Sequence, residues 1–322
     1  MRILIVTIPL PTATRPNTMT PLVYQIESLR ALGIQVDVLE IIGVSKLKYL
    51  QYLPTLYQRM AHTDLIHAHY GYCGWLARAQ FSKPVVVSFM GSDILGSPNA
   101  QGKIRPFSKL VVRLDRWLAG MVDAVIVKSA EMAEVVKPVK SYIIPNGVDL
   151  QAYSPMDRSQ AKAKLGWAED KRYILFAGNP DDSRKGFPLA QAAVSGAIQT
   201  MGEPLQLVPL RGVAVKTVPL YMNACEAMLM TSFIEGSPNV VKEAMACNLP
   251  VVSVPVGDTC ELLNGAVGYT VCPRDPQLLA EALVKTLNNR QPVEGRTALK
   301  RKGLSLDSVA HKIQAIYEEV LA

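Results

Sequence analysis

The sequence is poor in cysteine and histidine and has no long hydrophobic run. Its five cysteines are odd in number and include no Cys-x-x-Cys pair, which argues against a zinc site and against a disulfide framework. No segment reaches the roughly 18 apolar residues that cross a bilayer. The apolar start, residues 1–10, has no small-residue cleavage site, so it is expected to be a strand and not a signal peptide. These absences predict a protein of the reducing cytosol.

A glycine motif is missing as well. Nicotinamide dehydrogenases place Gly-x-Gly-x-x-Gly directly after the first strand, where the glycines admit the pyrophosphate of the dinucleotide. The corresponding stretch here, Thr12 to Thr20, contains no glycine. The sequence therefore argues against that class of enzyme.

What the chain does contain is typical of a globular α/β protein. Of its 322 residues, 49% are apolar and 19% are charged, and the length suits two domains that each bury a core. Short apolar runs alternate with helical stretches, which predicts parallel sheets covered on both faces. Strands are expected at residues 3–7, 36–41, 65–68, 85–89, 124–127 and 142–144, and again at 173–177, 205–208, 227–230, 251–254 and 269–271. Helices are expected near residues 20–32, 46–60, 73–80, 107–120, 129–136, 187–199, 238–247, 258–263 and 276–288.

Turn residues cluster between Pro145 and Pro155, where the first set of strands gives way to the second. We therefore expect a first domain over residues 1–155 and a second over 156–305. The last apolar-periodic stretch, 306–322, is expected to form a closing helix.

Positive charge is concentrated in the first half of the chain. Residues 1–150 hold 16 Lys and Arg against 10 Asp and Glu, a net +6, whereas residues 151–322 hold 18 against 17, a net +1. This balance suits an anionic acceptor or lipid headgroup, while nucleic-acid binding would rest on charge alone and is not predicted. The basic amphipathic stretch 103–117 is either a surface helix packed on a sheet or a docking face for membrane phospholipid.

The most informative stretch is residues 233–246, Phe-Ile-Glu-Gly-Ser-Pro-Asn-Val-Val-Lys-Glu-Ala-Met-Ala. It follows an apolar strand and opens a helix, with Ser237 as the expected N-cap and Pro238 at the first helical position. Free amides and the helix dipole at such a start favour an anion such as a phosphate. Glu235 and Glu243 flank this start, and about 9 Å of helix separates Glu243 from it. One carboxylate could bind hydroxyls on one side of a diphosphate and the other could bind hydroxyls on the far side. A nucleotide sugar has this layout of sugar, diphosphate and ribose.

Two neighbouring cations precede this stretch. Lys185 and Arg184 follow the expected strand 173–177 and could neutralise a departing diphosphate, although a solvated turn is the alternative. Asp181 and Asp182 in the same loop resemble a metal-binding pair, but adjacent loop carboxylates usually face solvent, and no metal is predicted.

Histidines and aromatic residues follow the third expected strand, in the run Ile-His-Ala-His-Tyr-Gly at residues 66–71. Strand alternation puts His67 and His69 on one face, with no third metal ligand in view. They form a structural pair, or His69 touches donor or acceptor. Tyr70, Tyr72 and Trp75 either line an acceptor groove or pack internally.

Residues 233–246 resemble the donor-site signature of glycosyltransferase family 4, whose members are retaining and metal-independent. Further segments resemble that family in the expected order: residues 173–178 with 184–187, the linker 144–149, the strand end 87–93 and the final helix 309–321. The resemblance implies the α/β architecture called GT-B, with two facing Rossmann-like domains built on parallel sheets. It also implies that the C-terminal helix crosses back to the first domain.

The resemblance implies a role for each matched residue. Glu235 meets the donor sugar, Glu243 holds the ribose, and Lys185 with Arg184 stabilises the diphosphate. Further donor contacts, mainly through backbone amides, are implied for Gly178, Gly236, Ser237, Pro238, Asn239, Val240 and Val241. The base pocket is expected at Pro209, Leu210, Arg211 and Val213, and the acceptor and sugar side at His69, Met90, Asp93 and Thr18.

Three positions depart from the family pattern. Met90 stands where members often have a histidine that meets the donor sugar, and Asn179 stands where a phosphate-facing arginine is usual. The loop after the first strand, often glycine-rich, lacks glycine. Arg184 is the expected replacement for the missing arginine.

We therefore expect a hexosyltransferase that moves a sugar from a nucleoside diphosphate, first of all a UDP-sugar, to a saccharide or lipid-linked acceptor of a bacterial envelope. No cofactor is implied. The expected location is the cytoplasm. The basic first half of the chain could also place the protein peripherally on the inner face of the membrane. A nucleotide-sugar 2-epimerase is one rival. It would need acid and base groups at C2 of the sugar, and the chain has only four histidines, which argues against it. A non-catalytic nucleotide-sugar binder is the second rival, kept open by Met90 and Asn179.

Overall fold

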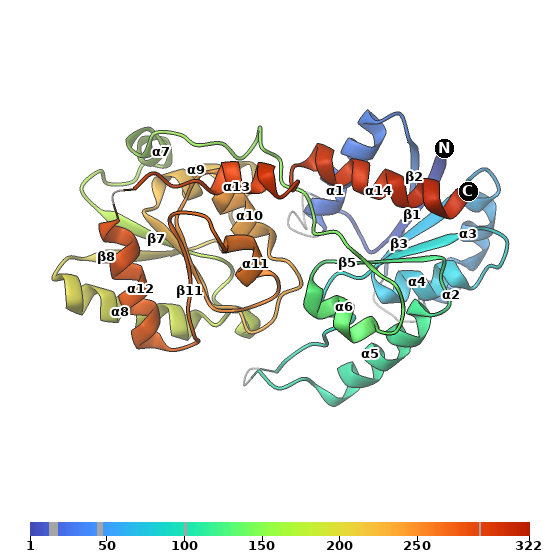
Figure 1. Ribbon diagram of the computed structural model, residues 1–322, viewed down its shortest axis with the longest axis horizontal. Coiled ribbons are helices and arrows are strands. Elements are labelled where there is room, and N and C mark those ends of the chain that lie inside the picture. Colours follow the sequence, from blue (N-terminus) through green and yellow to red (C-terminus); the bar gives the residue numbers. More distant parts are fainter. Residues whose placement is uncertain (13–18, 44–47, 100–101, 290) are drawn as a thin grey trace. The chain divides into compact units, whose positions relative to one another are not determined.

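The computed structural model describes all residues except 13–18, 44–47, 100–101 and 290. The chain forms two compact units (Figure 1). The first comprises Met1–Ser97, Ile104–Gly147 and Leu306–Ala322, and the second comprises Pro98–Lys103 and Val148–Ser305. Residue 155, the expected domain boundary, lies in the loop before the helix Arg158–Leu165.

The first unit is built on a sheet of six strands, all parallel in their register, in the order β2-β1-β3-β4-β5-β6. The four inner strands are buried on both faces, as is typical of parallel strands, whereas the two edge strands are partly exposed. Their bounds are β1 Arg2–Thr7, β2 Gln35–Glu40, β3 Leu65–His69, β4 Val85–Ser88, β5 Ala124–Val127 and β6 Tyr142–Ile143.

Alternate residues of these strands enter two separate cores. Ile3 and Ile5 pack against α1 (Thr20–Ala31) and α14 (Leu306–Leu321), which lie side by side on one face of the sheet (Figure 1). Leu4 and Val6 enter the opposite core. The helices on that face are α2 Lys48–Gln51, α3 Leu53–Met60, α4 Gly71–Arg78, α5 Pro106–Ala119 and α6 Ala130–Val136.

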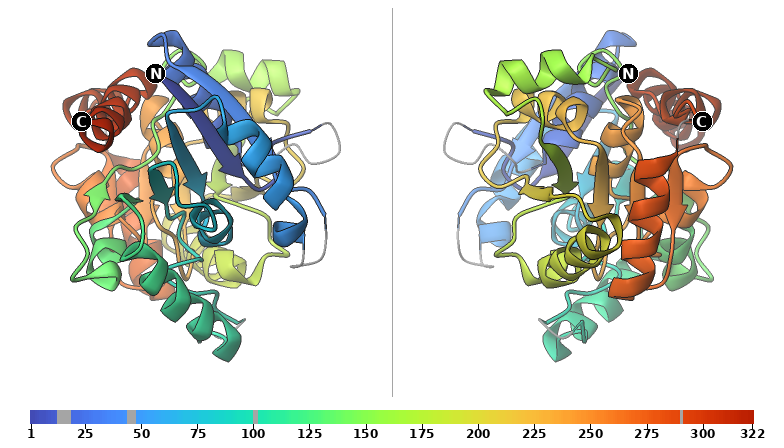
Figure 2. Two further views of the ribbon diagram at one scale, coloured as in Figure 1. Left: turned by 90° about the vertical axis from the view of Figure 1, so that its right-hand side faces the viewer. Right: turned by 90° about the vertical axis from the view of Figure 1, so that its left-hand side faces the viewer.

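The second unit has a parallel sheet of five strands in the order β11-β10-β9-β7-β8. Its strands are β7 Arg172–Phe176, β8 Leu205–Pro209, β9 Ala227–Met230, β10 Val251–Ser253 and β11 Tyr269–Val271. Helices α8 and α12 pack side by side on the sheet (Figure 2). The helices are α7 Arg158–Leu165, α8 Phe187–Met201, α9 Val218–Ala224, α10 Asn239–Ala246, α11 Thr259–Leu263, α12 Pro276–Asn288 and α13 Gly295–Arg301, with 3-10 turns at Ser183–Lys185 and Val215–Thr217.

Both sheets have the same doubly wound order when strands are counted within each unit. The chain first builds outward from β1 to β2, then returns to the other side of β1 with β3; β7, β8 and β9 repeat this path. The order therefore reverses between β1 and β3 and between β7 and β9. Ligands of such sheets bind at this reversal, beyond the carboxyl ends of the strands.

The sequence predictions for the strands are confirmed, with every end within one residue of its expected place. Three helices were not expected: α7, α9 and α13. They are short, and α7 and α13 are polar, so their apolar periodicity is weak. The helix expected over 46–60 is two helices, α2 and α3, and the first residues of that range lie outside the described part of the chain.

The C-terminal helix α14 closes the first unit, as the family resemblance implies. Its residues Ile313, Ile316 and Tyr317 are buried against the sheet. The Tyr317 hydroxyl lies 2.6 Å from Nδ1 of His67, and Nε2 of His67 lies 2.8 Å from the Ser88 hydroxyl. Burial lowers the pKa of His67 to about 3, so its ring is neutral and structural.

We predict that Tyr317→Phe destabilises the first unit without disturbing donor binding. The change leaves a buried ring nitrogen of His67 without its partner, which typically costs about 1–3 kcal/mol. The measurement is the urea midpoint of unfolding. Tyr57→Phe is the matched control, because the Tyr57 hydroxyl is exposed and makes only a 3.5 Å contact. Equal midpoints for the two variants would contradict the role of the His67 contact.

Candidate functional site

The candidate site lies at the strand-order reversal of the second unit. Lys185 belongs to the loop that follows β7, and Glu235 belongs to the loop that follows β9. These two strands are direct neighbours, so their loops leave the sheet side by side. The topology alone therefore brings together the cation and the carboxylate that the sequence analysis singled out.

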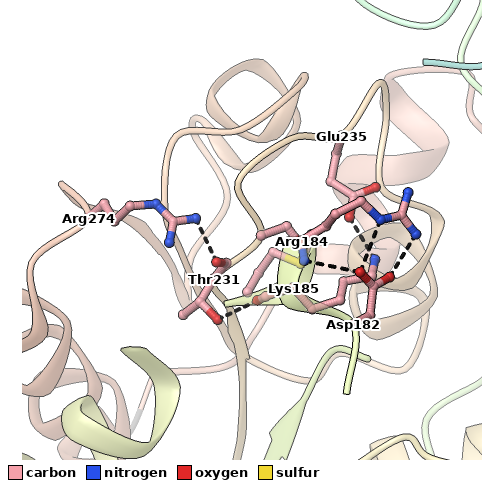
Figure 3. Close-up of polar contacts among 8 residues, drawn as sticks. Asp182, Arg184, Lys185, Thr231, Glu235 and Arg274 are labelled. Atoms are coloured by element: carbon pink, nitrogen blue, oxygen red, sulfur yellow. Dashed lines mark hydrogen bonds and ion pairs between the residues drawn. The ribbon is translucent and has the colours of Figure 1, made fainter. Parts of the chain in front are cut away.

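Lys185 and Glu235 form an ion pair across this reversal (Figure 3). The Lys185 ammonium lies 2.7 Å from Oε1 of Glu235, and the two side chains are only 24% and 20% exposed. Gly178 makes this position accessible: a Cβ there would lie 2.9 Å from Cγ of the Lys185 side chain. The structure thus places the predicted cation against the predicted carboxylate.

The second predicted cation, Arg184, is held by a neighbouring carboxylate. Its guanidinium donates two hydrogen bonds to Asp182, at 3.0 and 2.7 Å (Figure 3). This contact lowers the pKa of Asp182 and keeps it ionised. Asp181 pairs with Arg211 at 2.8 Å on the exposed surface. Both aspartates of the loop are therefore engaged by arginines.

An arginine that the sequence analysis did not single out joins the two loops. Arg274 follows β11, donates a 2.7 Å hydrogen bond to the carbonyl of Thr231, and stacks 3.8 Å from the ring of Phe233. The Thr231 hydroxyl in turn donates to the carbonyl of Lys185 at 3.0 Å. Gly186 adopts a positive φ and lies so close to the Thr231 carbonyl that a side chain there would collide with it. These contacts fix the position of the Lys185 backbone relative to the loop after β9.

The start of α10 differs from the expectation by one residue. The helix begins at Asn239 with Pro238 as its N-cap, so the prediction that Ser237 caps it is wrong. The reason is that the Ser237 hydroxyl is used elsewhere. It donates to Asp258 at 2.6 Å and accepts a 3.0 Å hydrogen bond from the ammonium of Lys242.

This Lys242–Ser237–Asp258 relay lies beneath the loop that carries Glu235. Lys242 is fully buried, and Asp258 is 8% exposed. Burial lowers the pKa of Lys242 to about 8, and burial raises the pKa of Asp258. Each charge is costly to bury alone, so the two are retained as a pair that fixes the turn at Ser237.

Glu243 lies one turn into α10. Burial raises the pKa of its carboxyl to about 7, while the neighbouring Lys242 and a hydrogen bond from Tyr153 act in the opposite direction. A carboxyl poised this close to neutrality is typical of a functional site. The hydroxyls of a ribose are the ligand that the sequence analysis assigns to it.

The other residues expected to contact the donor fall into two groups. Gly236 and Ser237 form the turn, and Asn239 and Val240 open the helix with partly exposed residues. Val241 has its side chain in the core, and its amide donates to the carbonyl of Pro238 at 3.2 Å, so its contact with the donor stays a prediction. The residues of the expected base pocket lie at the end of β8 and in the loop after it. Pro209 is the last residue of β8, and the amide of Leu210 donates a hydrogen bond to the carbonyl of Phe176 in β7. Arg211 and Val213 follow in the same loop.

The residues expected on the acceptor side are in the first unit. His69 is buried at the end of β3, near Gln25, and its Nδ1 finds no hydrogen-bond partner among the described residues. Asp93 accepts hydrogen bonds from the backbone amides of Met90, Gly91, Ile94 and Gly71 and so shapes the turn after β4. Contact of His69, Met90 or Asp93 with a substrate stays a prediction, and Thr18 lies outside the described residues.

Lys242, Asp258 and Arg274 are the members of the site that sequence reasoning missed. Lys242 had a visible signal, because together with Glu243 it stands between the apolar or small residues 240–241 and 244–246 of one helix. Asp258 and Arg274 carried none, since each follows a different strand and meets the site only in the folded sheet. Among the described residues, no three His, Cys, Asp or Glu side chains lie together as metal ligands would.

Two family profiles match consecutive parts of the chain. The profile described as Glycosyltransferase Family 4 matches residues 22–152, and the profile described as Glycosyl transferases group 1 matches residues 174–289. A D-inositol 3-phosphate glycosyltransferase of Geodermatophilus obscurus is 26% identical over 305 residues, which cover 80% of this chain and 66% of that relative. The corresponding protein of Actinosynnema mirum is 26% identical over 307 residues, covering 80% and 72%. The chain thus spans about two thirds of the length of these relatives.

Solved structures share the fold. Sucrose-phosphate synthase from Thermosynechococcus elongatus superposes with a TM-score of 0.80 at 18% identity, covering 99% of this chain and 98% of the other. Anabaena HepE in complex with UDP and glucose gives a TM-score of 0.73 at 19% identity, covering 98% and 99%. The architecture is therefore that of the two-domain GT-B glycosyltransferases. Within that class, the chain belongs to glycosyltransferase family 4.

We predict that Lys242→Met destabilises the second unit strongly. The Lys242 ammonium and the Asp258 carboxylate compensate each other across the Ser237 hydroxyl. Removing one of two such buried charges leaves the other uncompensated, at a typical cost of about 3–5 kcal/mol. The loss should be smaller at low pH, where Asp258 takes up a proton. The double variant Lys242→Met/Asp258→Asn should recover most of the loss.

Thermal and urea unfolding measure these differences. Lys216→Met is the control, because Lys216 is exposed in the same unit. A double variant as unstable as Lys242→Met would show that the relay does not act as a charge pair.

Proposed function

We propose that the protein is a retaining, metal-independent glycosyltransferase that moves a hexose-type sugar from a nucleoside diphosphate to an acceptor hydroxyl. The observation that supports it best is the Lys185–Glu235 pair, 2.7 Å apart at the strand-order reversal, with the half-buried Glu243 on the following helix. This arrangement offers a cation for a diphosphate and a carboxylate for hydroxyls on either side of it.

In this proposal the donor replaces the internal ion pair. The diphosphate takes the Lys185 ammonium, with Arg184 drawn from Asp182 as the second cation, and Glu235 turns to the hydroxyls of the sugar. Departure of the diphosphate concentrates negative charge on the bridging oxygen, and a fixed ammonium stabilises that charge without reorganisation of solvent. Glu243 accepts hydrogen bonds from the ribose and so holds the nucleotide in register.

The transfer itself needs no covalent intermediate on this chain. The acceptor hydroxyl attacks the anomeric carbon from the face that the diphosphate leaves, so the sugar keeps its anomeric configuration. The bond from the anomeric carbon to the phosphate oxygen breaks, and that oxygen receives the proton of the acceptor. The acceptor is bound by the first unit and is a saccharide or a lipid-linked intermediate of a bacterial envelope.

A UDP-sugar is the proposed donor. Anabaena HepE, which shares the fold, has been solved in complex with UDP and with UDP-glucose. The base would sit at the loop after β8, where Leu210 is tied to β7 and Arg211 is exposed. We place the protein in the cytoplasm, where nucleotide sugars are made available to such enzymes. No helix in the described part of the chain is long and apolar enough to cross a membrane.

One rival is kept open by a specific observation. Met90 and Asn179 replace two residues that the family often uses at the donor, and Asn179 instead caps its own loop by accepting from the amide of Asp181 at 3.1 Å. A protein that binds nucleotide sugars without turning them over would show the same fold and the same ion pair.

Donor hydrolysis separates the two functions. UDP-, GDP- and ADP-sugars are each incubated with the protein in EDTA, with and without saccharide and lipid-linked acceptors, and the free nucleoside diphosphate is measured. We expect turnover of one donor that survives EDTA. Lys185→Ala should lower kcat about 10²–10³-fold, since it removes one preorganised charge, and Lys216→Ala should leave it unchanged. Nucleotide binding with no turnover under any condition would favour the binder, and absence of both would refute the site.

The pH dependence of donor affinity tests Glu243. Its ionised form accepts the ribose hydroxyls, so KM for the donor should fall as pH rises through about 7, the raised pKa of this carboxyl. Glu243→Gln should raise KM and flatten the profile. Because the folded pKa lies above the ordinary 4.5, the contribution of Glu243 to stability is complete below the ordinary value and is lost as pH rises toward 7. A profile that Glu243→Gln leaves unchanged would contradict the assignment.

A further inference from the structure

Helix α5 of the first unit exposes an apolar stripe. Four large side chains, at spacings of three and four residues, lie on one face of the helix. Their exposures are large for apolar residues: Phe107 59%, Leu110 52%, Leu114 43% and Trp117 62%. Exposed apolar residues are common singly, but a contiguous row of this size marks an interaction surface.

The stripe continues into a groove of about 500 Å³ between α5, α4 and the segment of α2 and α3. This volume is within the range of about 300–1,000 Å³ that is usual for ligand sites. The walls are apolar and aromatic, and Trp75 and Trp117 lie with ring centroids 5.4 Å apart. The lining includes Tyr49, Leu50, Leu53, Tyr72, Leu76 and Val111.

The charges around the stripe have one sign. Residues 103–119 contain five basic side chains, all exposed, namely Lys103, Arg105, Lys109, Arg113 and Arg116. In the described part of the chain, none of these five makes an ion pair. The single acid of the stretch, Asp115, is 2% exposed and turns inward to accept a 3.1 Å hydrogen bond from the indole of Trp75. The outer face of α5 is therefore purely cationic and apolar.

We propose that this face docks on an anionic phospholipid bilayer, with α5 in the interface and one lipid hydrocarbon chain in the groove. Exposed cations next to an apolar stripe are what an interfacial helix requires, and each Lys or Arg near an anionic membrane surface contributes about 1 kcal/mol. Indole rings such as that of Trp117 favour the depth of the headgroups. A second copy of the chain is a poorer occupant, because a symmetric contact would set five cations against five.

The direct test is co-sedimentation with vesicles of phosphatidylcholine alone or mixed with phosphatidylglycerol. We expect binding to the anionic vesicles only, weakened by salt. Lys109→Ala/Arg113→Ala should reduce partitioning about 30-fold, which is two charges at about 1 kcal/mol each. Lys300→Ala/Arg301→Ala removes the same charge from exposed positions on α13 and should have no effect.

The groove is tested separately from the charges. Leu110→Ser/Leu114→Ser keeps every cation and should still lower partitioning at least about ten-fold through the lost apolar contact. Brominated lipid chains should quench the tryptophan fluorescence of the bound protein, and Trp117→Phe should remove most of that quenching. Binding with no quenching would show adsorption by charge alone and would overturn the groove assignment.

Two other outcomes would overturn the proposal outright. Equal loss of binding in the α13 control would mean that net charge, and not α5, attracts the vesicles. Self-association in solution that Leu110→Ser/Leu114→Ser abolishes would assign the face to a second copy. Donor hydrolysis without vesicles should be unchanged in all α5 variants, so a failure here is distinguishable from a failure of the proposed transferase function.

Discussion

The buried relay from Lys242 through Ser237 to Asp258 is the constraint on which the candidate site depends. Two charges withdrawn from water tolerate little displacement, because each loses its compensation when the other moves. The hydroxyl between them belongs to the turn that carries Glu235. The relay therefore fixes the position of the loop after β9. The ion pair between Glu235 and Lys185 then restrains the loop after β7. Thr231 links the same two loops, because its hydroxyl donates to the carbonyl of Lys185 and its own carbonyl accepts from Arg274.

The site also illustrates why a doubly wound sheet suits a diphosphate. At the point where the strand order reverses, the connections that follow two neighbouring strands lead to opposite sides of the sheet. They leave a crevice between them, and side chains from both loops converge there. In the second unit these are a cation after β7 and a carboxylate after β9. A helix start follows the carboxylate at once. A cation and a carboxylate that are 50 residues apart in sequence thus meet beside the start of a helix.

Much of this could be predicted from the sequence, and the limits are physical. Buried parallel strands are continuous apolar runs, so all eleven were located to within one residue. Glu235, Glu243 and Lys185 stood out because they follow such runs. Helices α7 and α13 escaped because neither has a strong apolar stripe. Asp157 caps α7 by accepting from the amide of Gln160, whereas α13 has no side-chain cap and packs against α10. Asp258 and Arg274 could not be linked to the site, since only the lateral order of strands makes them neighbours of Ser237 and Thr231. The capping role expected of Ser237 failed for the same reason.

Helix α14 completes a unit whose other residues end at Gly147. On a ribosome the whole second unit, Val148–Ser305, is therefore synthesised before the first can close. Until then α1 packs on one face of the first sheet without α14, so part of the core around Ile3, Ile5 and Ile126 stays uncovered. Uncovered apolar surface of this kind makes a nascent chain prone to aggregate and dependent on chaperones. The order of completion is thus the reverse of the order of synthesis, and a fragment that stops at Gly147 would carry the exposed face permanently.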